Sequence, residues 1–133
     1  MFHQGAVHWA ASSSNVEILK MILKAGASPF VVDNMGRYPL SSVLVSDVST
    51  WYDLLKVLIN TGLPINAKSD KGQYFMASLF ANSHTPPSVV HLLLESGADL
   101  SPRVRDNMTL LEMARMFASP DVLDVVNQFY KDM

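Results

Sequence analysis

The sequence predicts an all-α protein in which pairs of short helices stack in a row. Three observations support this fold class. Apolar residues recur at helical spacing in four segments, a glycine follows three of them, and another turn-forming residue stands ten positions after each glycine. A layout that repeats along a chain indicates stacked units that share one continuous core.

The four apolar segments predict the longer helix of each pair. In residues 15–24, Val16, Leu19 and Ile22 fall on one helix face, and Asn15 is a typical N-cap. The same pattern predicts helices over residues 50–59, 85–95 and 119–129, with N-caps at Thr50, Thr85 and Ser119 and first-turn prolines at Pro86 and Pro120.

Glycines separate the predicted pairs. A glycine just past a helix closes the last turn in the left-handed conformation, and a glycine or asparagine further on permits a tight turn. We therefore expect three hairpin-like loops, called the first, second and third finger. They start at Gly26, Gly62 and Gly97, and their turn residues are Gly36, Gly72 and Asn107.

The shorter helix of each pair is expected after a finger, over residues 39–46, 75–82 and 110–117. The first two glycines are 36 residues apart and the next two are 35 apart, while the fingers keep a constant spacing. The extra residues should therefore lie between the two helices of a pair, near residues 44–53 and 80–88.

These features resemble ankyrin-repeat proteins, whose unit of about 33 residues holds a hairpin turn and two helices. Residues 7–11, VHWAA, resemble the L-H-x-A-A part, and residues 33–40, DNMGRYPL, resemble D-x-x-G-x-T-P-L. Residues 97–99, GAD, resemble the turn after the second helix, and Asn66 matches the asparagine that follows this turn. The resemblance implies an ankyrin-repeat solenoid of about four helix pairs joined by three hairpin-like loops. It implies a single domain over 1–133, with repeats at about 4–32, 33–68, 69–103 and 104–133.

The chain departs from the family pattern at several structural positions. Tyr38 and Tyr74 replace the family threonine, and Phe75 replaces the proline. The family histidine is present as His8 and is absent from the other three units. We expect these changes to remove hydrogen bonds between neighbouring repeats and to give a less regular array. The residues that replace the histidine are Ser41, Ala77 and Glu112.

The composition excludes several classes of function. About half of the 133 residues are apolar, which favours a packed domain, and the net charge of −2 gives no general attraction to nucleic acid. Cysteine is absent, so disulfides and thiolate metal sites are excluded. The first residues show no signal peptide, and no apolar run is long enough for a membrane span. We expect an intracellular protein, cytoplasmic or nuclear.

No arrangement of side chains predicts catalysis. The resemblance implies that His8 is structural, and Ser12, Ser13 and Ser14 are typical of helix caps and turns. His84 and His91 lack zinc-binding spacing, and no glycine-rich phosphate loop is present. The sequence therefore predicts no enzyme activity, no cofactor, no metal and no small-molecule substrate.

The resemblance implies that a partner protein or peptide docks on the concave side, along the shorter helices and the fingers. Val45, Met116 and Phe117 are apolar where solvent is expected and are candidate anchors; Phe117 can alternatively fold back as part of a C-terminal cap. Arg37 and Arg105 can engage an acidic or hydrogen-bonding partner segment or be solvated. The full candidate set is Asn34, Met35, Arg37, Val45, Asp70, Lys71, Gln73, Asn82, Arg105, Asp106, Met108, Met116 and Phe117.

The sequence thus predicts a protein-interaction module. The alternative is a passive structural or targeting segment of a larger protein, such as a ubiquitin-ligase adaptor or a signalling enzyme. The two ends of the array also differ. Asn127 gives the last helix a polar residue where the first long helix has Leu23. We expect that the chain is part of a longer array, or that residues 1–3 or a partner cover the first unit.

Overall fold

The computed structural model describes residues 6–66, 74–104 and 107–131 of the chain. In sequence order, the helix pairs are α1 (Ala6–Ala11) with α2 (Val16–Lys24), the 3₁₀ helix η1 (Pro39–Val45) with α3 (Trp51–Ile59), α4 (Phe75–Ala81) with α5 (Pro87–Glu95), and α6 (Leu110–Phe117) with α7 (Pro120–Lys131). These residues form helices and no sheet, so the predicted all-α class is confirmed.

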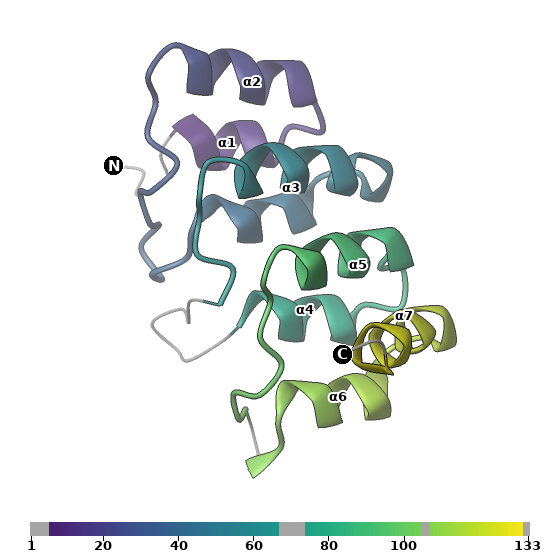
Figure 1. The fold of residues 1–133 in the computed structure, drawn as a ribbon. Helices are drawn as coiled ribbons and strands as arrows, with labels where there is room; N and C mark the ends of the chain where they lie inside the picture. Colours follow the sequence, from purple (N-terminus) through teal and green to yellow (C-terminus); the bar gives the residue numbers. More distant parts are fainter. Residues whose placement is uncertain (1–5, 67–73, 105–106, 132–133) are drawn as a thin grey trace.

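The helices form two layers (Figure 1). The longer helices α2, α3, α5 and α7 make the outer layer, and each contacts the next in this order. The shorter helices α1, η1, α4 and α6 make the inner layer. One cluster of buried apolar side chains runs between the layers from the first pair to the last. The core is therefore a ribbon, in which each pair is stabilised by its neighbours.

Two of the predicted helix caps are confirmed. The Oδ1 atom of Asn15 accepts hydrogen bonds from the backbone N–H groups of Glu17 and Ile18, at 3.1 and 3.2 Å. The Oγ atom of Ser119 accepts from the N–H of Val122 at 3.3 Å. Both side chains satisfy donors that the first helical turn leaves without a partner.

Thr50 occupies the N-cap position of α3, as predicted, but its side chain makes no cap hydrogen bond. The prediction of an N-cap at Thr85 is wrong. Each hydroxyl donates to a carbonyl of the preceding segment instead: Thr50 to Asp47 at 2.6 Å, and Thr85 to Leu79 at 2.7 Å. Residue 86 is the cap residue of α5, and the helix begins one residue later. Thr85 is buried, so its hydroxyl needs an acceptor, and the end of α4 supplies it.

The second pair contains the extra residues that were expected between its helices. They form the short 3₁₀ helix η2, Val48–Thr50. The inner helix of this pair, η1, is itself 3₁₀ throughout. Its sequence PLSSVLV holds two serines and two β-branched valines, which have low α-helix propensity.

The turn residues have the predicted backbone conformation. Gly26, Gly62 and Gly97 have φ angles of 101°, 90° and 106°, as helix-closing residues require. At the finger turns Gly36 has φ 76° and Asn107 has φ 63°. The prediction for Gly72 falls outside the described residues.

Hydrogen bonds connect neighbouring pairs despite the departures from the family pattern. The imidazole Nε2 of His8 lies 2.9 Å from the carbonyl oxygen of Arg37, in the first finger. The Oγ atom of Ser14 accepts from the N–H of Asp47 at 2.8 Å. Both bonds join the first pair to the segments around η1.

A further link joins the second and third fingers. The Asn66 amide donates to the carbonyl of Gly97 at 3.1 Å and accepts from the N–H of Asp99 at 2.8 Å. The equivalent positions one repeat earlier, four and two residues after the glycines, hold Phe30 and Pro64. Proline has no N–H, so an asparagine at position 30 would lack one of these two bonds.

Candidate functional site

The inner helices leave a row of apolar side chains exposed at their C-terminal ends. Val45 of η1 is 78% exposed, Met116 of α6 is 64% exposed, and Ala81 of α4 is exposed. Each stands two residues after a fully buried residue of the same helix, which places the three at equivalent positions. We call Val45, Ala81, Met116 and the neighbouring Phe117 the inner-helix row. The buried reference residues are Val43, Leu79 and Ala114.

Phe117 does not fold back onto the core. Its side chain is 58% exposed at the last residue of α6. Isolated exposed apolar residues are common on protein surfaces, but adjacent ones on equivalent positions form a patch. Met116 and Phe117 therefore form a small apolar contact surface at the C-terminal end of α6.

The first finger is held rigid by Asp33. The Oδ1 atom of Asp33 accepts from the N–H groups of Met35 and Arg37, both at 2.9 Å, and the guanidinium Nε of Arg37 donates to Oδ2 at 2.9 Å. Burial alone would raise the pKa of Asp33, but the hydrogen bonds from Arg37 and Met35 lower it below 3.8. The finger thus presents Asn34, which is exposed, and Met35, which is half-buried, on a fixed loop.

Arg37 is paired with a carboxylate of its own finger. Its Nε atom is paired with Asp33, and its side chain is 38% exposed. The guanidinium is therefore part of the finger's own structure, and a partner would meet it already bound to a carboxylate.

The third finger is described only in part. The N–H of Val104 donates to the carbonyl of Met108 at 2.6 Å, and the guanidinium of Arg103 donates to the carbonyl of Asn107. Met108 is half-buried. The candidates Asp70, Lys71, Gln73, Arg105 and Asp106 lie outside the described residues.

Asn82 has a structural role. Its Oδ1 atom accepts from the N–H of His84 at 2.8 Å, which shapes the turn between α4 and α5. Because the acceptor is used within the chain, Asn82 offers a partner only its amide N–H₂ and remaining acceptor capacity.

Sequence reasoning missed two exposed apolar features. Trp9 of α1 is 59% exposed, and Phe30, Val31 and Val32 of the first finger are 52%, 44% and 41% exposed. Three consecutive apolar residues in a loop expected to face solvent are a signal that could have identified this run. Trp9 stands alone between the buried residues His8 and Ala10, at the unspecified position of the L-H-x-A-A pattern.

The residues considered for catalysis take structural positions. His8 is buried, and Ser12 and Ser13 donate to the carbonyls of Trp9 and Ala10 at the end of α1. Ser14 closes this turn with φ 62°. Within the described part of the chain, no three His, Asp or Glu side chains are grouped as metal ligands. No helix there is long and apolar enough to cross a membrane.

Residues 4–34 match the family model of the ankyrin repeat. This segment of the chain is therefore an ankyrin repeat. The match covers α1, α2 and the start of the first finger, and the stacked pairs beyond it have the same order of finger, inner helix and outer helix. Ankyrin repeats are in general protein-interaction modules.

The curated proteins that are similar in sequence to this chain include transcription factors and a subunit of a nuclear factor. The chain is 29% identical to transcription factor MBP1 of Kluyveromyces lactis, over 97% of this chain and 18% of that protein. It is 28% identical to the nuclear factor NF-kappa-B p105 subunit of Gallus gallus, over 81% of this chain and 11% of the relative. A shorter match, 38% identical over 42% of this chain and 7% of the relative, is to transcription factor SWI6 of Pyricularia oryzae. The chain thus spans less than a fifth of the length of each relative.

Proposed function

We propose that this ankyrin-repeat array binds a partner protein or peptide through the inner-helix row and the adjoining finger tips. The observation that carries this proposal is the exposure of Val45, Met116 and Phe117 on the inner layer, while the core side chains of the same helices are buried. Exposed apolar side chains on a rigid scaffold lose their contact with water when a partner packs against them.

The rigidity of the scaffold favours binding over a passive role. The carboxylate of Asp33 accepts two hydrogen bonds from the finger backbone and one from the Arg37 guanidinium. A preorganised surface loses less conformational entropy on binding than a flexible one. A passive spacer needs no exposed apolar row.

A protein partner suits the surface better than nucleic acid. The chain has a net charge of −2, and the inner-helix row holds no cation. Binding to DNA or RNA depends mainly on contacts between cationic side chains and phosphates. The relatives named as transcription factors support a role in the nucleus or cytoplasm, as one segment of a regulator of transcription.

The proposal is tested by affinity capture with matched variants. The wild-type chain, a Met116→Ala/Phe117→Ala variant and a Met21→Ala variant are used as baits. Met21 is the matched control, because it is a methionine of similar exposure, 68%, on the outer layer. A partner retained by wild type and Met21→Ala but lost by the double variant supports the proposal.

Equal capture by all three baits contradicts it, as does retention of double-stranded DNA by the wild-type chain with the same dependence on Met116 and Phe117. Circular dichroism melts of each bait establish that a loss of capture does not arise from unfolding.

A further inference from the structure

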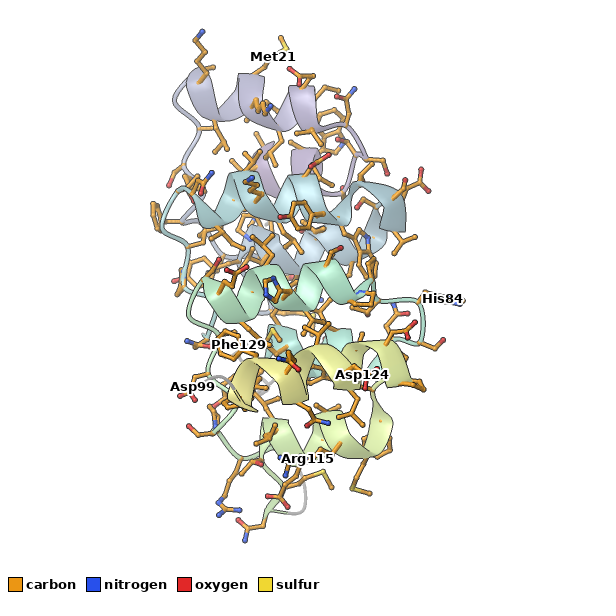
Figure 2. All side chains as sticks on the ribbon, turned by 45° about the vertical axis from the view of Figure 1, so that its right-hand side comes forward. Met21, His84, Asp99, Arg115, Asp124 and Phe129 are labelled. Atoms are coloured by element: carbon orange, nitrogen blue, oxygen red, sulfur yellow. The ribbon has the colours of Figure 1, made fainter. Side chains whose placement is uncertain are left out.

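The two ends of the array are built differently. In Figure 2, Met21 of α2 projects from one end and Arg115 of α6 lies at the other. A terminal pair has a neighbour on one side only, so the residues buried within it show which positions face that neighbour.

The last outer helix identifies the positions that face a preceding pair. In α7 the fully buried residues are Val122 and Val126. The residue after Val122, Leu123, is half-buried, and the residue after Val126, Asn127, is exposed. In α5 the equivalent couples, Val89 with Val90 and Leu93 with Leu94, are all buried, because α5 has neighbours on both sides. The first member of each couple therefore faces the preceding pair, and the second faces the following pair.

The first outer helix has apolar residues at the positions that face a preceding pair. These are Ile18 and Ile22, which stand eight and four residues before Gly26, as Leu54 and Leu58 stand before Gly62. Leu54 and Leu58 are fully buried, whereas Ile18 and Ile22 are only half-buried.

The inner helix of the first pair agrees with this assignment. Ala6 is the first residue of α1 and is exposed. Phe75 and Leu110, the first residues of α4 and α6, are buried. We call Ala6, Ile18 and Ile22 the N-terminal end face.

The opposite end carries polar residues at two outward-facing positions, while a third holds the half-buried Leu123. Arg115 stands directly after the buried Ala114, where α4 has Phe80, which is 1% exposed. Asn127 stands directly after the buried Val126, where α5 has Leu94, which is 3% exposed. Both polar residues are exposed. Such substitutions are what a terminal repeat needs to remain soluble.

We propose that the N-terminal end face is a stacking surface for one further helix pair of the same kind, which extends the array beyond α1 and α2. The argument is continuity with the existing interfaces. The helix α2 contacts α3, and α3 contacts α5. At the positions equivalent to Ile18 and Ile22, α3 and α5 hold fully buried residues: Leu54, Leu58, Val89 and Leu93. The polar C-terminal end offers no equivalent surface.

The test extends the array at each end in turn. In one chain, a copy of residues 75–109 replaces residues 1–5 directly before Ala6, so that the copied third finger enters α1 as it enters α6. In a second chain, a copy of residues 96–131 is attached after residue 131, so that a copied third finger leads into the added helix pair as it leads into α6. Thermal unfolding and amide hydrogen exchange of α2 are then measured.

The N-terminal extension is expected to raise the melting midpoint by roughly 5–10 °C and to slow exchange in α2 at least about tenfold. The C-terminal extension should leave both unchanged. Ile22→Asn in the extended chain should remove the gain. Lys20→Asn should keep it, because the equivalent residues Lys56 and His91 stay exposed in α3 and α5.

Three results would overturn the proposal. One is an equal gain at both ends, and another is a gain that survives Ile22→Asn. The third is sedimentation of the unextended chain as a dimer that Ile22→Asn dissociates, because a second copy would then be the occupant.

Discussion

The Nε2 atom of His8 lies 2.9 Å from the carbonyl oxygen of Arg37, and this bond crosses from the first helix pair to the first finger. His8 is 1% exposed. Removal of the imidazole deletes this bond and leaves a cavity, while the Arg37 carbonyl still accepts from the N–H of Asp33 at 2.9 Å.

His8→Ala is therefore expected to lower the free energy of unfolding by about 1–3 kcal/mol. Urea titration followed by circular dichroism measures this change. The control is His84→Ala, at an exposed residue of the α4–α5 turn, which should stay within about 0.5 kcal/mol of wild type. Equal effects of the two substitutions would show that the His8 bond has no structural importance.

The carboxylate of Asp33 makes the stability of the first finger depend on pH. Hydrogen bonds from Arg37 and Met35 hold its folded pKa below the ordinary value of 3.8. At pH values between the folded pKa of Asp33 and its unfolded pKa, the unfolded chain binds more protons than the folded chain. The free energy of unfolding therefore rises with pH in this range. The contribution is present above pH 3.8 and is lost as the pH falls through the folded pKa.

Asp33→Asn should destabilise the chain at pH 7 by about 1–2 kcal/mol, and this difference should shrink below pH 4. Unfolding midpoints measured between about pH 3 and pH 7 test both parts. Asp124→Asn, at an exposed residue of α7, is the matched control. A constant difference between Asp33→Asn and wild type across this range is inconsistent with the assignment.

Asn66 connects the second and third fingers through bonds to Gly97 and Asp99. Asn66→Ala should lower the free energy of unfolding by about 0.5–1.5 kcal/mol. The reverse change one repeat earlier, Phe30→Asn, should give no comparable gain, because Pro64 cannot donate. Denaturant titrations of both variants measure these changes in the free energy of unfolding. If Phe30→Asn stabilises the chain as much as Asn66→Ala destabilises it, the role assigned to the Asn66 bonds is wrong.

The ribbon-like core depends on leucines of the outer helices. Leu55 and Leu93 are fully buried. Leu55→Ala or Leu93→Ala should each cost about 2–5 kcal/mol, whereas Met21→Ala on the exposed side of α2 should have little effect. Guanidinium titrations measure these values. Losses below about 1 kcal/mol at both leucines would contradict the observed packing.

The sequence predicted the features that depend on local backbone chemistry. Gly26 and Gly36 adopt positive φ, and Asn15 caps α2, because these roles are set by the residue and its immediate neighbours. Thr50 and Thr85 also have typical cap chemistry. Their hydroxyls instead donate to the carbonyls of Asp47 and Leu79, three and six residues earlier, and residue type alone does not decide between these acceptors and the first helical turn.

The candidate site could be predicted in part for the same reason. Helical spacing and the family resemblance placed Val45, Met116 and Phe117 toward solvent, and all three are exposed. The pairing of Arg37 with Asp33 was missed, although they are four residues apart, because a finger loop has no fixed side-chain spacing. Whether these residues bind a partner stays a prediction.

Hydrogen exchange measured with and without a captured partner tests the central claim most directly. Binding through the inner layer predicts slower exchange in residues 39–46, 75–82 and 110–117. It predicts unchanged exchange in the outer helices α2, α3 and α5. Protection confined to the outer helices, with the inner helices unaffected, would contradict the claim.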